Sequence, residues 1–243
     1  MRENHSRIYK IDGVGVDLSR FRPATEAERS DLRRAHGFSD DDFILLYVAE
    51  FIPRKNHKLL FDILPGLKER IPGLKVVLCG KGRLLDYYRD FASRRGMVYV
   101  TFTGYTNEVA EWCQLADVHI STSVQEGQGL NLVEAMACGL PLVASDIRGH
   151  RDVIAGFEGG ILCDLSAPRS FADAVLLLEK NAALRAEISV RNVERARLFS
   201  VVSAVRCMAE IYEGMMARGH AGGGYNCRVV VLRIPAAWGA YAA

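Results

Sequence analysis

The stretch DVHISTSVQEGQGLNLVEAMACGLPLVASD, residues 117–146, sets the pattern for the rest of the chain. It begins and ends with short runs suited to buried strands, and strong helix formers lie between them. Gly139 marks the end of the helical part, and Pro141 follows just beyond it. The stretch therefore predicts a strand, a polar loop, a helix and a second strand, over Asp117–Thr122, Ser123–Gly129, Leu130–Cys138 and Leu140–Ser145.

The loop and the start of the helix carry groups suited to a polar ligand. Glu126 follows the carboxyl end of a strand, where ligands bind in open parallel sheets. Gly127 and Gly129 allow a bound group to approach the backbone, and the helix that begins near Leu130 directs unpaired N–H groups to the same place. Glu134 lies one turn into the helix and leans back toward its start. Amide donors beside carboxylate acceptors indicate a phosphorylated sugar or a nucleotide; the alternative is a surface loop with two solvated glutamates.

The run E-G-x-G-L-x-x-x-E-A-M-A-C-G-L-P-L-V-A-S-D, residues 126–146, resembles the E-x7-E signature of retaining nucleotide-sugar glycosyltransferases of family four, the glycosyl transferases group 1. These enzymes have two Rossmann-like domains, the GT-B architecture. The resemblance covers about residues 13–215 and corresponds to the donor-binding, C-terminal half. Within residues 11–23, G-V-D-x-x-x-F-x-P resembles the linker between the two domains. The resemblance implies transfer of a hexose-type sugar from a nucleotide diphosphate such as a UDP- or GDP-sugar to an acceptor hydroxyl, without a metal or other cofactor.

The same resemblance assigns roles to individual residues. Glu126 is expected to contact the donor sugar and Glu134 the ribose hydroxyls, with Glu126 and Lys55 as the catalytic pair. Donor-binding positions are expected at Arg54, Gly127, Gly129, Leu130, Glu134 and Tyr105. Members of the family usually carry Gly-Arg before the lysine, but this chain has Ala49-Glu50. Arg54 is the candidate replacement for that missing cation, and the alternative is a solvated basic turn.

Two further turns follow predicted strands. Tyr105, after Gly104, is expected to stack on the nucleotide base, or else to be a surface aromatic residue. Gly80-Lys81-Gly82 resembles the G-x-G turn of the family, but a tight turn from strand to helix is the preferred explanation. Because Leu85 stands where a dinucleotide fingerprint needs its third glycine, the chain is not expected to bind NAD.

The histidines are isolated in the sequence, and none is expected to act as a catalytic base. His119 lies in a predicted strand and is expected to be a packed core residue. His150 is expected on a loop after a strand edge, where it is a candidate donor contact.

Composition indicates an ordinary soluble α/β protein. The 243 residues are 49% hydrophobic and 25% charged, with a net charge of +2, which gives no reason to expect nucleic acid. The first ten residues are polar, and no apolar run approaches the roughly 20 residues of a membrane helix. Six scattered cysteines without metal-ligand spacing predict reduced, packed thiols, no metal site and a cytoplasmic protein, or one at the inner face of the membrane.

Apolar segments of strand length alternate with segments of helical spacing along the whole chain. This alternation predicts a doubly wound parallel sheet of the Rossmann-like α/β class. Pro65, inside one predicted helix, indicates a kink or an early end. Further strands are expected over Phe43–Ala49, Leu74–Cys79, Val98–Phe102 and Gly160–Cys163. Further helices are expected over Ala24–Gly37, His57–Arg70, Leu84–Arg95, Glu108–Leu115, Gly149–Ala155, Phe171–Glu179, Ala182–Arg197 and Val201–Met216.

Three segments are expected: a linker from an absent N-terminal domain over residues 1–23, a nucleotide-sugar-binding domain over 24–213, and an unassigned, flexible tail over 214–243. The tail has three open interpretations: a disordered segment, a cloning or reading-frame artefact, or a weak membrane-surface contact through Arg218, Arg228, Arg233 and Trp238.

These features favour a half-enzyme that acts on an acceptor glycan or a lipid-linked sugar, in cell-surface polysaccharide or glycoconjugate synthesis. Its partner is expected to be a separate N-terminal half or another subunit. The competing hypothesis is an inactive nucleotide-sugar-binding module. A redox or phosphotransfer Rossmann protein is a third class, disfavoured by the incomplete dinucleotide fingerprint.

Overall fold

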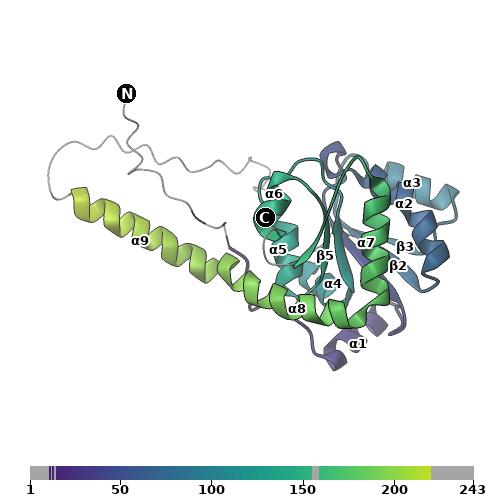
Figure 1. The fold of residues 1–243 in the computed structure, drawn as a ribbon, viewed down its shortest axis with the longest axis horizontal. Helices are drawn as coiled ribbons and strands as arrows, with labels where there is room; N and C mark the ends of the chain where they lie inside the picture. The colour runs from purple at the N-terminus through teal and green to yellow at the C-terminus, as the bar shows by residue number, and fades with distance from the viewer. Residues whose placement is uncertain (1–10, 12, 14, 155–158, 220–243) are drawn as a thin grey trace. The chain divides into compact units, whose positions relative to one another are not determined.

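The structure, a computed structural model, describes residues 11, 13, 15–154 and 159–219 (Figure 1). It divides into two compact units. One is Val16–Arg197, which contains the sheet and the candidate site. The other combines the chain up to Gly15 with the chain from Leu198 onward, and includes helix α9 (Val201–Gly219).

A six-stranded sheet forms the centre of the unit Val16–Arg197. Its strands run in the order β3-β2-β1-β4-β5-β6, and every neighbouring pair is parallel. The predicted α/β class and doubly wound parallel sheet are therefore confirmed. The strands are β1 (Phe43–Val48), β2 (Leu74–Cys79), β3 (Val100–Gly104), β4 (Val118–Ser121), β5 (Leu142–Ser145) and β6 (Gly160–Cys163).

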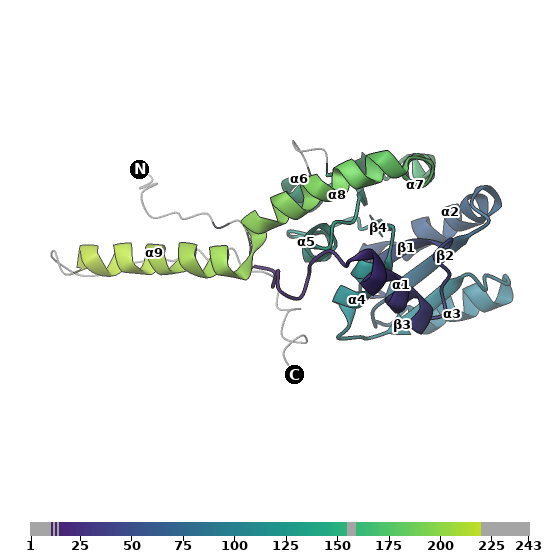
Figure 2. The same ribbon diagram turned by 90° about the horizontal axis from the view of Figure 1, so that it is seen from below.

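Helices connect the strands and cover the sheet. Right-handed crossovers send the connections from β1 to β3 along one face, and those from β4 to β6 along the other. Three pairs of helices pack together on the sheet: α2 with α7, α1 with α4, and α5 with α8 (Figure 2). These helices are α1 (Glu26–Ala35), α2 (His57–Arg70), α3 (Leu85–Arg94), α4 (Val109–Leu115), α5 (Leu130–Ala137), α6 (Arg148–Ile154), α7 (Pro168–Lys180) and α8 (Ala182–Ala196).

The core lies on both faces of the central strands. Ile44, Leu45 and Leu46 of β1 are fully buried in succession, as are Val76–Leu78 of β2. A strand covered on both faces reads as a continuous apolar run, because neither side meets water. Burial of each such side chain contributes about 1.5–3 kcal/mol to folding, so the sheet is a rigid platform for the loops at its edge.

Two predicted boundaries differ from the structure, whereas the helix around Pro65 has its predicted bounds. The early end considered at Pro65 does not occur, since α2 continues to Arg70 with Pro65 on its exposed side. The strand expected from Val98 begins at Val100 instead, since Val98 is 95% exposed and follows a turn at Gly96. Residues 214–219 continue α9 and do not begin the expected tail, and the rest of that tail, including Arg228, Arg233 and Trp238, lies outside the described residues.

Candidate functional site

The loops after β1 and β4 form the candidate site. These two strands are neighbours, and the chain leaves them in opposite directions, toward β2 and toward β5. Such a switch point leaves a crevice at the carboxyl ends of the strands, where ligands bind in this type of sheet. The loop after β1 ends in the short 3-10 helix Pro53–Lys55, and the loop after β4 carries Glu126.

Lys55 and Glu126 meet across this switch point. The Nζ atom of Lys55 donates a hydrogen bond to Oε1 of Glu126 in a close ion pair. The two side chains are only 13% and 9% exposed, so water screens the pair weakly. Ser123 Oγ donates to the same carboxylate oxygen at 2.8 Å. The structure thus brings together the two residues that the sequence predicts as the catalytic pair.

A second set of hydrogen bonds fixes the backbone of Lys55. Tyr47 Oη donates to the Lys55 carbonyl oxygen at 2.6 Å, and Thr122 Oγ1 lies 3.1 Å from the same oxygen and 3.0 Å from that of Asn56. Burial raises the pKa of Tyr47 to about 12, so its phenol keeps its proton. Asn56 then turns the chain with φ 52°, the one positive value at a described residue other than glycine.

His150 packs beneath the loop after β4 and contacts Ser121 at the end of β4 and Ser145 at the end of β5. It is fully buried in α6, so its expected place on a loop is wrong. Its Nδ1 lies 2.9 Å from the Ser145 carbonyl oxygen, and its Nε2 lies 3.3 Å from Ser121 Oγ. Ser145 Oγ donates to the Ser123 carbonyl oxygen. Burial lowers the pKa of His150 and so favours a neutral ring with its proton on Nδ1, where the carbonyl accepts it.

A glycine allows α6 to approach Glu126 closely. A Cβ atom on Gly149 would lie 2.5 Å from the Glu126 carbonyl oxygen, far inside van der Waals contact. A side chain here would therefore push the loop away from the sheet. The absence of a side chain at Gly149 thus lets α6 pack directly against the backbone of Glu126.

The start of α5 has no side-chain cap, and the exposed Gly127 precedes it. Gly129, its N-cap, has φ 66° and provides no side-chain cap for the first turn, which begins at Leu130. A Cβ atom on Gly127 would have no neighbour within 4 Å, which fits close approach by a bound group, whereas at Gly129 it would meet His150 and Leu132. Asn131 Nδ2 donates to the Val48 carbonyl oxygen at 3.0 Å and ties the helix start to the end of β1.

Glu134 lies in the same helix, in a different environment. Its side chain is partly buried, and its carboxylate accepts no hydrogen bond and forms no ion pair with any described residue. Burial raises its pKa to about 7, and the positive charge of Arg20 opposes that rise only in part. The Glu134 carboxylate therefore has no partner among the described residues, and it ionises near neutral pH.

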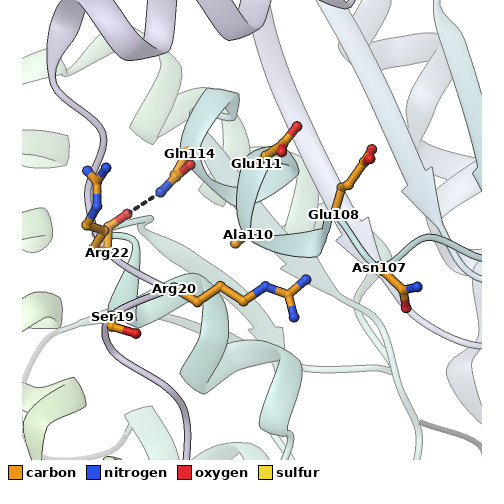
Figure 3. A pocket seen from close by; sticks show the side chains of 8 residues that line it. All are labelled: Ser19, Arg20, Arg22, Asn107, Glu108, Ala110, Glu111 and Gln114. Atoms are coloured by element: carbon orange, nitrogen blue, oxygen red, sulfur yellow. Dashed lines mark hydrogen bonds between the residues drawn. The ribbon is translucent and has the colours of Figure 1, made fainter. Parts of the chain in front are cut away.

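Tyr105 lies just after β3, and its hydrogen-bond partner Asn107 lines a pocket. The ring is 41% exposed, Lys81 Nζ lies 4.7 Å from its centroid, and its hydroxyl donates to Asn107 Oδ1 at 3.1 Å. The pocket has a volume of about 290 Å³, and Figure 3 shows Arg20 extending into it from the linker toward the start of α4. Its lining is Ser19, Arg20, Arg22, Asn107, Glu108, Ala110, Glu111 and Gln114.

The model of the family described as glycosyl transferases group 1 matches residues 28–195. The chain belongs to this family. EpsD of Bacillus subtilis, a glycosyltransferase by name, is 38% identical over 211 residues, which cover 86% of this chain and 55% of EpsD. A D-inositol 3-phosphate glycosyltransferase of Nocardioides is 30% identical over 216 residues, 82% of this chain and 46% of that protein. The chain thus spans about half the length of the curated relatives it matches.

Two solved structures share the fold. Anabaena Alr3699/HepE in complex with UDP and glucose matches with a TM-score of 0.73 at 23% identity, over 82% of this chain and 55% of that one. Sucrose-phosphate synthase from Thermosynechococcus elongatus matches with a TM-score of 0.73 at 25% identity, over 84% of this chain and 52% of that one.

The loop after β1 departs from the family sequence at Ala49 and Glu50. Glu50, at the position where the sequence resemblance leads us to expect Arg, is exposed to solvent. The carbonyl oxygen of Arg54 accepts a hydrogen bond from the Val124 N–H at 2.8 Å, which places Arg54 beside the loop after β4. Its Nε atom is buried and has no hydrogen-bond partner among the described residues. Arg54 therefore lies between the two loops with its side chain unpaired in the described part of the chain.

Gly80 and Gly82 serve packing against this loop. A Cβ atom on Gly80 would lie 2.0 Å from the Ala49 carbonyl oxygen, and one on Gly82 would lie 2.7 Å from the Phe51 backbone. Phe51 also donates to the Lys81 carbonyl oxygen at 2.8 Å. The two backbones are thus locked together, as expected of a tight turn.

The other central histidines are core residues. His119, as predicted, is fully buried, and His57 stacks on Phe51 with 4.2 Å between ring centroids. Neither ring has a hydrogen-bond partner within the described residues, and burial lowers the pKa of each to about 3. Both are therefore neutral.

Four cysteines, Cys79, Cys113, Cys138 and Cys163, are buried as predicted, and no disulfide joins the described cysteines. Within the same residues, no cluster of three or more His, Cys, Asp or Glu side chains is arranged to hold a metal ion. None of the described helices combines the length and the apolar character that a membrane span requires.

Proposed function

We propose that this chain binds a nucleotide diphosphate sugar and forms the donor half of a retaining glycosyltransferase. One observation carries the proposal: Lys55 and Glu126, remote in sequence, form a sheltered pair beside the uncapped start of α5, and an unpartnered Glu134 lies just inside that helix. A cation and backbone amides bind the diphosphate of a nucleotide sugar, and carboxylates accept hydrogen bonds from its hydroxyl groups.

Each part of the donor has a candidate partner. Lys55, Arg54 and the backbone amides of Gly127–Leu130 bind the diphosphate, and Glu134 accepts hydrogen bonds from the ribose hydroxyls. Glu126 contacts the donor sugar. Tyr105, whose side chain is 41% exposed, stacks on the base.

The proposed chemistry is electrostatic. As the bond from the anomeric carbon to the diphosphate breaks, negative charge grows on the leaving group, and fixed donors around Lys55 and α5 stabilise it without a metal. Removal of one such donor typically costs about 3–4 kcal/mol of barrier. The Glu126 carboxylate stabilises the positive charge that develops at the anomeric carbon.

The acceptor, a glycan or a lipid-linked sugar, binds to a second domain or subunit. Helix α9 supports this part of the proposal, because large apolar residues such as Val202 and Val205 are mostly exposed on it. An exposed apolar stripe is typical of a surface that meets a partner. The expected setting is the cytoplasm, or the inner face of the membrane, in synthesis of a cell-surface polysaccharide or glycoconjugate.

A thermal-shift panel of UDP, GDP, ADP and their sugars tests donor binding. A ligand at about 100 times its dissociation constant should stabilise the fold by about 2.7 kcal/mol. Lys55→Met should abolish the shift, whereas Lys58→Met, which changes an exposed side chain in the first turn of α2, should retain it. Equal shifts for both variants would remove Lys55 from the site, and a wild type without any shift would contradict the proposal.

A second candidate function is a nucleotide-sugar-binding module without turnover. Ala49 and Glu50 favour it, since a carboxylate stands where the sequence resemblance leads us to expect a cation at the diphosphate. A turnover assay with an added N-terminal half from a relative such as EpsD separates the two. Product formation supports the transferase, and binding without product supports the module.

A further inference from the structure

A group of buried hydroxyls lies beneath the Lys55–Glu126 pair. Four strand-end residues, Ser121, Thr122, Ser123 and Ser145, join Tyr47 of β1 and His150 of α6, and all six side chains are fully buried. Buried hydroxyls are costly unless they are hydrogen-bonded, so their partners are informative.

One arrangement of protons satisfies the whole group. With neutral His150, the Nδ1–H donates to the Ser145 carbonyl oxygen and Nε2 accepts from Ser121. The Ser145 hydroxyl donates to the Ser123 carbonyl oxygen, and Tyr47 and Thr122 donate to that of Lys55. The proton of Ser123 is then directed to Glu126 Oε1 at 2.8 Å. In this arrangement every donor of the group is used once, and the Ser123 proton is the one directed to Glu126.

From this arrangement we infer that Ser123 is a positioning residue that fixes the Glu126 carboxylate for the donor sugar, while Tyr47 positions the backbone of Lys55 for the diphosphate. The inference rests on the proposed function and adds residues that act through others. Lys55 alone holds Glu126 through a flexible chain with rotatable N–H donors, which defines the carboxylate plane poorly. Ser123 provides the second, fixed point, because its own carbonyl oxygen is held by Ser145.

The two positioning residues should affect different parts of the ligand. Loss of the Ser123 hydroxyl leaves Lys55 in place and releases one side of Glu126. Binding of the sugar should then weaken while binding of the nucleoside diphosphate remains. Loss of the Tyr47 hydroxyl shifts Lys55 and should weaken both ligands alike.

The test is calorimetric titration with UDP and UDP-glucose, or with GDP and GDP-mannose where the wild type prefers guanine. The contribution of the sugar is measured as the dissociation constant of the nucleoside diphosphate divided by that of the nucleotide sugar. Ser123→Ala should lower that ratio about tenfold, the effect of one charge-assisted hydrogen bond, without changing the affinity for the diphosphate alone. Tyr47→Phe should weaken the binding of both ligands and keep the ratio. The control Ser170→Ala, at a partly exposed serine of α7, should change neither the affinities nor the ratio.

A purely structural role for Ser123 would lower the melting temperature and the active fraction for both ligands equally, and an unchanged ratio would overturn the inference. Should Ser123→Ala fail to fold, Ser123→Cys keeps the size of the side chain with a much weaker donor and should lower the ratio in the same direction. In a Glu126→Ala background, the Ser123 substitution should have no further effect on the ratio; a second full loss there would contradict the inference. A wild type that binds no nucleoside diphosphate overturns the proposed function itself, and with it this inference.

Discussion

Glu126 and Glu134 come from one short motif and occupy opposite environments. Glu126 accepts hydrogen bonds from Lys55 and Ser123 before any ligand arrives. Glu134 is partly buried without a described partner, and its pKa is raised to about 7. The first glutamate of the motif is thus already paired, whereas the second has no partner among the described residues.

The difference indicates how the site divides its electrostatic work. A paired carboxylate is preorganised and needs little rearrangement when the donor binds. An unpaired one is unfavourable in the empty protein and becomes favourable when hydroxyl groups reach it. Glu126 therefore suits the reacting end of the ligand, and Glu134 suits recognition.

Lys55→Met should have the largest effect on stability, because it leaves the sheltered Glu126 carboxylate without its counter-ion. We expect a loss of about 3 kcal/mol in the free energy of unfolding, measured in urea at neutral pH. Lys58→Met, which breaks the exposed pair with Asp62, should cost less than about 0.5 kcal/mol.

The double variant Lys55→Met with Glu126→Gln should recover most of that loss, since it no longer buries an unpaired charge. If the double variant instead loses as much stability as the two single variants together, the pair is not coupled, and the contrast with Glu134 is removed.

Binding of UDP-glucose should strengthen about tenfold from about pH 6 to about pH 8. Ribose hydroxyls donate to an ionised carboxylate, and a group of pKa about 7 is ionised to roughly a tenth at the lower of these pH values. The diphosphate diester does not change its charge over this range, so the titration reports on the protein. Calorimetry should find proton release on binding, and Glu134→Gln should bind with the same affinity at both pH values. A wild type without pH dependence would separate Glu134 from the ribose.

Glu134→Gln should also stabilise the empty protein at about pH 8 and change little at about pH 5. The folded pKa lies above the ordinary value of 4.5, so the folded state holds a proton that the unfolded state has lost, and stability falls as pH rises between the two values. For a partly exposed group we expect about 1 kcal/mol, or about 2–4 °C in melting temperature. Destabilisation at the higher pH would mean that Glu134 has a stabilising partner.

Glu50→Gln should give the smallest effect and extends the comparison to a glutamate in solvent. Removal of an exposed negative charge near the proposed diphosphate site should tighten UDP binding about threefold at low salt, with the gain lost at high salt because of screening. Glu69→Gln, at the far end of α2, is the control. A weaker affinity would mean that Glu50 itself contacts the ligand.

Periodicity was sufficient for most of the fold. The helix over His57–Arg70 and the strand over Leu74–Cys79 match the structure, because each is a continuous apolar pattern bounded by polar residues. The boundaries near Val98 and residue 214 were wrong. The sequence around Val98 does not differ from that of the strand that follows, and only its exposure in the structure shows that Val98 lies outside the strand. Likewise, the sequence at residue 214 does not show that α9 continues to Gly219.

The site could be predicted only in part. Local spacing identified Glu126 and Glu134, but the strand order that places Lys55 beside Glu126 is a long-range property. Tyr47 and Ser123, which lie far apart in sequence, were missed for the same reason. The run Ser121-Thr122-Ser123 was a usable signal, since three hydroxyls at the end of a buried strand need partners.

The close contact of Gly80 with Ala49 bears on the speed of ligand capture. The loop that carries Lys55 is fastened to the neighbouring turn, so it has little freedom to lose when a diphosphate arrives. Encounters should need no slow rearrangement on this side of the crevice, and association should proceed close to the rate that diffusion and charge attraction permit.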